Sequence, residues 1–166
     1  MISISKLIST FFYIGLFPKA PGTLASFVTV LFWVLFISFN IKLYFVIIVL
    51  ILFTLSFYFV DEYLLDNESK DPKEVVIDEV IGQSIPLIAV PFSDDLVTIF
   101  LIFIFFRFFD ILKIYPINLI EKINGSKGVI LDDVLAGIYT AALVSIISLF
   151  IWLLINIYFN LKKNVN

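Results

Sequence analysis

Five carboxylates stand at points of the sequence where apolar helices are expected to begin or end. Asp78 and Glu79 open the run IDEVIGQ, Asp132 and Asp133 lie in LDDVLAG, and Asp110 lies in RFFDILK. Oxygen ligands of this kind suit a hard cation, Mg²⁺ above all, which binds through one or two carboxylates plus substrate phosphate. Without a metal, grouped carboxylates in apolar surroundings would repel one another. The pattern favours Mg²⁺-assisted phosphate chemistry.

Cationic and hydroxyl side chains accompany these acids. Arg107 and Lys113 stand three residues to either side of Asp110, so the three share one broad helical face. The loop GLFPKAPGT brings Lys19 and Thr23 to the start of the next helix, where backbone N–H groups favour an oxyanion. We expect both groups to hold phosphate oxygens, with Arg107 binding two at once.

Each cluster also has a purely structural explanation. Thr23 could cap the helix after its loop, an acid in a first helical turn is stabilised by the helix dipole, and the charges of RFFDILK could form an ion-pair ladder. The dipole explains one acid better than two, and charge at the end of an apolar helix is costly unless it is paired or used. Gly82, one turn after Asp78, is expected to leave room for a ligand or metal.

The composition is that of an integral membrane protein. Of 166 residues, 61% are hydrophobic and 15% charged, and the mean hydropathy is +1.11, well above a soluble domain. The length suits one domain, residues 1–166. Histidine and cysteine are both absent, which excludes a phosphohistidine, a histidine base, a cysteine nucleophile and a thiolate metal site. No basic block suggests nucleic-acid binding.

Four apolar blocks must position the chemistry. Leu24–Phe39, Leu43–Val60 and Val134–Phe159 approach or reach the roughly 17–25 residues of a spanning helix, and the first two are expected to pair through a polar turn at residues 40–42. The block Val80–Phe109 is interrupted by Pro86, Pro91 and PFSDD. We interpret it as two short helices, Val80–Val90 and Leu96–Phe109, folded back as a hairpin shielded by other helices; a single kinked span is the competing interpretation.

The hairpin places most cations on one side of the membrane. The eight on that side are Lys6, Lys19, Lys70, Lys73, Arg107, Lys113, Lys122 and Lys127, against Lys42, Lys162 and Lys163 on the other. The excess of lysine and arginine predicts that the first side is cytoplasmic. All five carboxylates lie on that side too.

The N-terminus is expected to form a short amphipathic helix in the membrane interface. Ser5, Lys6, Ser9, Thr10 and Tyr13 recur at helical spacing, and no small-x-small site marks a cleaved signal peptide. The expected fold is therefore all-α and polytopic, with three long helices, a short broken-helix hairpin and an N-terminal interfacial helix.

Four motifs in this order resemble the phosphatidylglycerophosphatase A family: GLFPKAPGT, VIDEVIGQ, RFFDILKIYPI and GSKGVILDDVLAG. The likeness covers about residues 15–140. It implies a multi-pass lipid phosphatase of the cytoplasmic (inner) membrane that uses Mg²⁺ and faces the cytoplasm. Its substrate would be phosphatidylglycerophosphate among the membrane lipids, and its product phosphatidylglycerol. The matching positions are Pro21, Gly22, Thr23, Asp78, Glu79, Gly82, Arg107, Asp110, Lys113, Pro116, Gly128, Asp132, Asp133, Ala136 and Gly137.

From the chemistry of these side chains we assign each of them an expected role. Catalytic residues would be Asp78, Glu79, Asp110 and Asp133, and the metal ligands these four with Asp132. Phosphate would be held by Lys19, Thr23, Arg107 and Lys113. We favour a metal-activated water attacking the phosphomonoester in line, with Glu79 a ligand or the base that orients the water; the Asp-x-Asp signature of common aspartyl-phosphate enzymes is absent. Where the family has Lys-Pro-x-Pro, Lys113 precedes Ile114, so the helix is expected to end less abruptly.

Other classes of protein share some of these features. A phosphatidyl-group transferase also uses Mg²⁺ and several aspartates, but its extended Asp-x-x-Asp-Gly motif is absent. A carboxylate-lined cation transporter would carry acids within its spans, and the three long blocks hold none. A membrane scaffold with acidic helix caps would not explain four clusters on one side.

Overall fold

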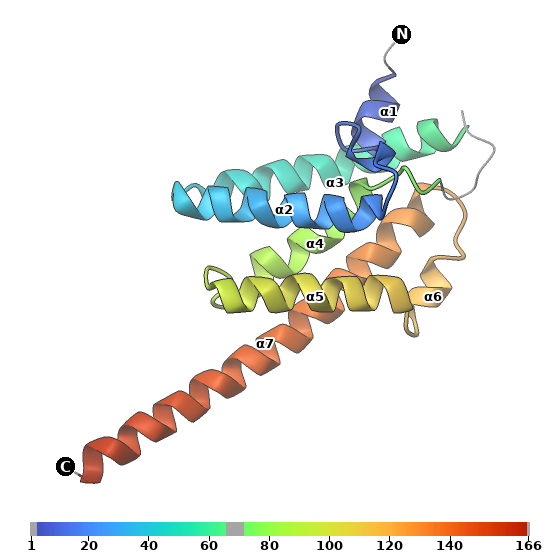
Figure 1. Cartoon of the computed structure of the whole chain (residues 1–166). Coiled ribbons are helices and arrows are strands. Elements are labelled where there is room, and N and C mark those ends of the chain that lie inside the picture. The colour runs from blue at the N-terminus through green and yellow to red at the C-terminus, as the bar shows by residue number, and fades with distance from the viewer. Residues whose placement is uncertain (1–2, 66–71, 166) are drawn as a thin grey trace.

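The computed structural model describes residues 3–65 and 72–165, with side chains as far as Tyr158, and these residues form helices and no strands (Figure 1). Lys70 therefore lies outside the described residues, as do the side chains of Lys162 and Lys163. The elements are α1 Ile4–Ser9, η1 Ile14–Leu16, α2 Pro21–Ser38, α3 Lys42–Leu65, α4 Ile77–Ala89, α5 Leu96–Leu112, α6 Ile117–Ile120 and α7 Ser126–Val165. The predicted all-α fold is confirmed.

Three helices are long and apolar enough to cross a membrane: α2, α3 and the part of α7 from Ser126 to Tyr158. They correspond to the three predicted blocks, each starting earlier than predicted. The start of α2 shows why, because Pro21 has the backbone angle of a first helical residue and no N–H to leave unpaired. Thr23 therefore lies inside the first turn, and its prediction as the helix cap was wrong.

The fourth block is a hairpin. α4 and α5 are joined by a turn that lies beside the turn between α2 and α3. Two contacts hold the turns together: Trp33 Nε1 donates a hydrogen bond of 2.8 Å to the carbonyl oxygen of Ser93, and Lys42 pairs with Asp94. α5 then runs back toward the start of α4, as Figure 1 shows. The single kinked span was wrong, and the predicted hairpin brings Arg107 back to the level of Glu79.

α4 lies at the centre of the bundle, against α7 and α2 (Figure 1). Two glycines let α4 and α7 approach closely. A Cβ on Gly82 would lie 2.6 Å from the carbonyl oxygen of Asp133, and one on Gly137 would overlap the carbonyl oxygen of Gly82. The prediction that Gly82 leaves room for a ligand was wrong, since the backbone of α7 fills that space.

The N-terminal helix exists, but its polar side faces the protein. α1 has six residues, and Ser5 and Ser9 are buried. Ser9 Oγ donates a hydrogen bond of 3.2 Å to the carbonyl oxygen of Phe59 in α3. Ile4 and Phe12 are 62% and 66% exposed instead. Three of the five predicted polar residues, Ser5, Ser9 and Thr10, are therefore buried in the protein. The position of this helix in the membrane interface stays a prediction.

Candidate active site

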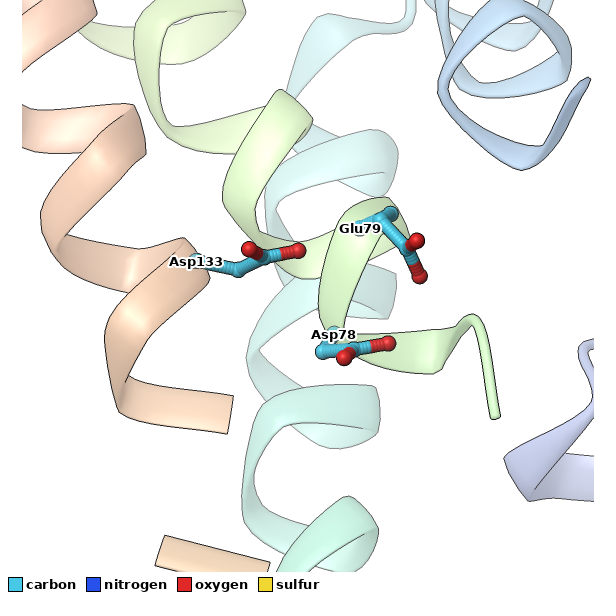
Figure 2. A group of neighbouring side chains, drawn as sticks. All are labelled: Asp78, Glu79 and Asp133. Atoms are coloured by element: carbon cyan, nitrogen blue, oxygen red, sulfur yellow. The ribbon is translucent and has the colours of Figure 1, made fainter. Parts of the chain in front are cut away.

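Three carboxylates from two helices converge at one end of the bundle. Asp78 and Glu79 lie in the first turn of α4, and Asp133 points toward them from α7 (Figure 2). One oxygen of each carboxylate lies within 4.8 Å of the other two. Asp78 Oδ1 and Glu79 Oε2 are buried and accept no hydrogen bond from any described residue. This geometry suits a cation that would satisfy several oxygens at once.

Asp133 reaches this position because α7 begins well before it. Ser126 is the first residue of α7, so Asp132 and Asp133 lie in the second turn, and the expectation that they open the helix was wrong. The N–H of Ser126 donates a hydrogen bond of 2.7 Å to Oδ1 of Asp61, which lies 65 residues earlier in the sequence. Asp61 thus pairs with an N–H that would otherwise have no partner at the start of the helix. No local sequence pattern predicts this contact.

Asp110 is held by a cation on its own helix. Arg107 approaches Asp110 at 2.6 Å and Glu79 at 4.0 Å, and Nη1 of Arg107 donates a 3.4 Å hydrogen bond to Ser26 Oγ. The three-residue spacing therefore produces an intrahelical ion pair. Arg107 joins that pair to α4 and α2, so the pair belongs to the site.

Lys113 does not extend the ion-pair ladder of Arg107 and Asp110, because its partners lie outside α5. It pairs with Asp132 at 2.5 Å and with Glu121 at 3.2 Å. Its backbone is left-handed, with φ +42°, and ends α5 sharply after Leu112, so the expectation of a less abrupt end was wrong. Asp132 is thereby directed to Lys113, whereas Asp133 faces the converging carboxylates.

A cavity of about 370 Å³ joins these groups. Its lining residues are Ala20, Pro21, Gly22, Thr23, Lys73, Val75, Asp78, Glu79, Arg107, Asp110, Ile111, Lys113 and Asp133. Asp132 and Lys19 are not among them; Asp132 lies behind Lys113, and Lys19 is exposed. Lys73 was not predicted as a site residue, because it precedes α4 in a polar stretch with no helical spacing to the other charges.

The charges of the cavity are unbalanced. Four carboxylates and three cations line it, so its net charge would be negative if all seven groups were ionised. Burial, then the Glu79 and Asp133 carboxylates, raise the pKa of Asp78 well above its usual value, and burial raises the pKa of Glu79 to about 7. Burial alone would lower the pKa of Lys113, but Asp132 outweighs it and raises that pKa. The acids are costly to ionise together unless a cation joins them.

Three named proteins are similar in sequence to this chain over most of its length. A protein of Haemophilus influenzae named Phosphatidylglycerophosphatase A is 35% identical over 149 residues, 89% of this chain and 90% of that protein. Its namesake in Escherichia coli is 30% identical over 138 residues, 82% and 79% of the two chains. A Bacteroides thetaiotaomicron protein provisionally named phosphatidylinositol-3-phosphatase is 35% identical over 144 residues, 84% and 91%.

No solved structure matches the chain significantly. The family assignment therefore rests on sequence. The structure agrees with it, because the motif residues converge at one end of the bundle. Residues 7–148, which hold all four motifs, match the family described as Phosphatidylglycerophosphatase A. The chain belongs to the phosphatidylglycerophosphatase A family, and is a phosphatase.

Proposed function

We propose that the chain hydrolyses phosphatidylglycerophosphate to phosphatidylglycerol and inorganic phosphate, with Mg²⁺, at the cytoplasmic end of its helical bundle. The observation that carries the proposal is the convergence of Asp78, Glu79 and Asp133 in a cavity that also presents Arg107 and Lys113. The carboxylates suit a hard cation, and the cationic side chains beside them suit phosphate oxygens.

The donor set fits Mg²⁺. Asp78 Oδ1 and Glu79 Oε2 are buried without a hydrogen-bond partner among the described residues, and an unpaired buried carboxylate is strongly disfavoured. Asp78, Glu79 and Asp133 would hold the ion, with Asp110 beside them. When bound, Mg²⁺ would stabilise charge on the phosphate and activate a water. Asp132 is better placed to orient Lys113 than to bind the ion, because it lines no part of the cavity.

The charge of the cavity supports a cation requirement. A phosphomonoester carries about two negative charges near neutral pH, and it would be repelled by the cavity if all four carboxylates were ionised. A bound divalent cation would keep these carboxylates ionised and leave the cavity with a net positive charge. We therefore expect Mg²⁺ to favour substrate binding as well as the reaction.

Different side chains of the cavity would bind the phosphate and transfer the proton during hydrolysis. Arg107, held by Asp110, and Lys113, held by Asp132, are oriented before substrate arrives. They would hold the phosphate oxygens while a water oxygen bonds to phosphorus and the bond from phosphorus to the glycerol oxygen breaks on the opposite side. A cavity carboxylate would take one proton of the water, with Glu79 placed for this role or for the metal. The same carboxylate would pass that proton to the glycerol oxygen, which leaves as the alcohol.

The alternatives fit the geometry less well. A cation pathway would carry acids along the spans, but the carboxylates of the cavity gather at one end of the described bundle and α7 carries none from Val134 to Tyr158. A second substrate deserves a direct assay because one relative bears the name of a phosphatidylinositol-3-phosphatase.

The test is phosphate release by purified protein in detergent. Phosphatidylglycerophosphate and phosphatidylinositol 3-phosphate are each assayed with Mg²⁺ and with a chelator, beside Asp133→Asn. The proposal expects release from phosphatidylglycerophosphate that needs Mg²⁺ and that the substitution abolishes. Release from the inositol lipid alone would replace the substrate, and full release in chelator would remove the metal from the mechanism.

A further inference from the structure

One rim of the cavity is apolar and lies on the outer surface of α5. Ile111 lines the cavity next to Asp110, yet its side chain is 66% exposed. It follows Arg107 by one helical turn, so the charged wall and the apolar rim meet at the same end of α5. A ligand at this rim would touch phosphate-binding and apolar groups together.

The rim continues as a stripe along α5. Its five residues recur at intervals of three and four, which places them on one helical face. The α5 stripe consists of Val97, Phe100, Ile104, Phe108 and Ile111, with exposed fractions of 64%, 62%, 44%, 50% and 66%. Its last member is the cavity residue, so an unbroken apolar surface leads along the helix to the carboxylates.

The space between α2 and α5 beside the cavity offers no alternative route. Arg107 bonds to Ser26 across it, and one turn further from the cavity the rings of Phe27 and Phe103 pack edge to face with centroids 6.2 Å apart. On this side of the cavity, a hydrocarbon chain attached to the headgroup would therefore pass over the outside of α5 and not between α2 and α5.

We propose that the α5 stripe is the docking surface for the acyl chains of the lipid substrate, and that the headgroup enters the cavity over Ile111. This inference rests on the proposed function and adds the route by which its substrate arrives. The phosphate lies among Arg107, Lys113 and the bound cation while the chains stay in contact with apolar side chains. The stripe favours a phosphomonoester anchored in the bilayer over the same headgroup on a short, water-soluble lipid.

The first test compares chain lengths. Phe108→Ser/Ile111→Ser interrupts the stripe, and Ile47→Ser/Leu50→Ser is the matched control, two exposed residues at the same spacing on α3. Hydrolysis of long-chain phosphatidylglycerophosphate is compared with that of a short-chain analogue. The stripe variant should lower the long-to-short ratio of kcat/KM by about tenfold, the effect of losing the acyl-chain contacts of two partly exposed apolar side chains, and the control should not. An unchanged ratio in the stripe variant would overturn the proposal.

The second test does not depend on catalysis. Because the chain has no cysteine, Ile111→Cys and Leu65→Cys each introduce a single thiol that a water-soluble maleimide can report; Leu65 is 87% exposed at the end of α3. Long-chain phosphatidic acid, a phosphomonoester lipid, should slow labelling at position 111 several-fold more than phosphatidylcholine does, with no such difference at position 65. Equal protection of the thiol at position 111 from labelling by the two lipids would overturn the proposed docking surface. If the wild-type protein hydrolyses no lipid but this protection is seen, the proposed function fails and the docking surface stands.

Discussion

The two ends of the α4–α5 hairpin carry the same sequence feature and use it differently. Asp94 and Asp95 precede α5, where Asp95 caps the helix by accepting a 3.0 Å hydrogen bond from the N–H of Thr98, and Asp94 pairs with Lys42. At the other end Asp78 and Glu79 lie inside the first turn of α4, each with a buried oxygen left unpaired by the described residues. The acids of the turn cap a helix and form an ion pair, whereas the acids of the cavity lie close together with oxygens that lack hydrogen-bond partners among the described residues.

This difference comes from what packs against each pair. The side chain of Asp94 is 51% exposed, so water and one lysine satisfy it. Asp78 and Glu79 instead face a third carboxylate, Asp133, because glycines let α7 approach α4. Two adjacent acids before an apolar helix are therefore a weak functional signal by themselves. The approach of a third acid from a distant helix distinguishes the site.

The largest expected contrast is between one acid at each end. Asp133→Asn should lower phosphate release by at least about a hundredfold, because it removes a group from the reacting centre. Asp94→Asn should leave release nearly unchanged. Thermal melting in detergent checks folding, and the Asp133→Asn protein should melt no lower than wild type, since the substitution relieves repulsion among buried carboxylates. Loss of activity in both variants would mean that both ends serve the reaction.

Substitutions of two glycines near the site should have different effects, one on stability and the other on activity. A Cβ on Gly82 would meet the backbone of α7, so Gly82→Ala should destabilise the protein by about 1–3 kcal/mol. A Cβ on Gly22 would overlap only the movable carboxylate of Glu79, so Gly22→Ala should keep the melting temperature and lower activity about tenfold, by displacing one oriented group. Melting and phosphate release are measured on both. The contrast fails if Gly22→Ala melts as low as Gly82→Ala.

Lys73 sharpens the comparison within the cavity. Among the described residues it pairs with no carboxylate, whereas Arg107 and Lys113 each do, so its charge is free for the phosphate of the substrate. Lys73→Ala should raise KM about two- to fivefold with kcat little changed, the effect of one exposed charge, and added salt should shrink the difference. Lys127→Ala, an exposed lysine outside the cavity lining, is the control. An unchanged KM would exclude Lys73 from substrate binding.

Much of the fold follows from local sequence. Run length predicts the three spanning helices, and the proline-interrupted fourth block predicts the hairpin, because both depend on hydrophobic length and backbone chemistry within one segment. The start of α7 could not be found this way. It depends on Asp61, which is distant in the sequence and accepts a hydrogen bond from the N–H of Ser126.

The site was predictable in its residue types and less so in its pairings. Spacing predicts that Arg107 and Asp110 share a face, and they pair. Which carboxylates converge depends on tertiary contacts, so a sequence cannot separate Asp133, which faces the cavity, from its neighbour Asp132, which binds Lys113. One residue of register on α7 decides between the two positions.

The smallest expected effect tests the turn end itself. Lys42 and Asp94 form an ion pair whose side chains are 40% and 51% exposed, and such pairs contribute at most about 1 kcal/mol. Lys42→Ala should therefore lower the melting temperature slightly and leave kcat and KM unchanged, because Trp33 still ties the turn to α2 through Ser93. A large loss of stability would show that the turn end is held by charge as strongly as the cavity end. A changed KM with normal stability would show instead that the far turn is coupled to the cavity through the hairpin.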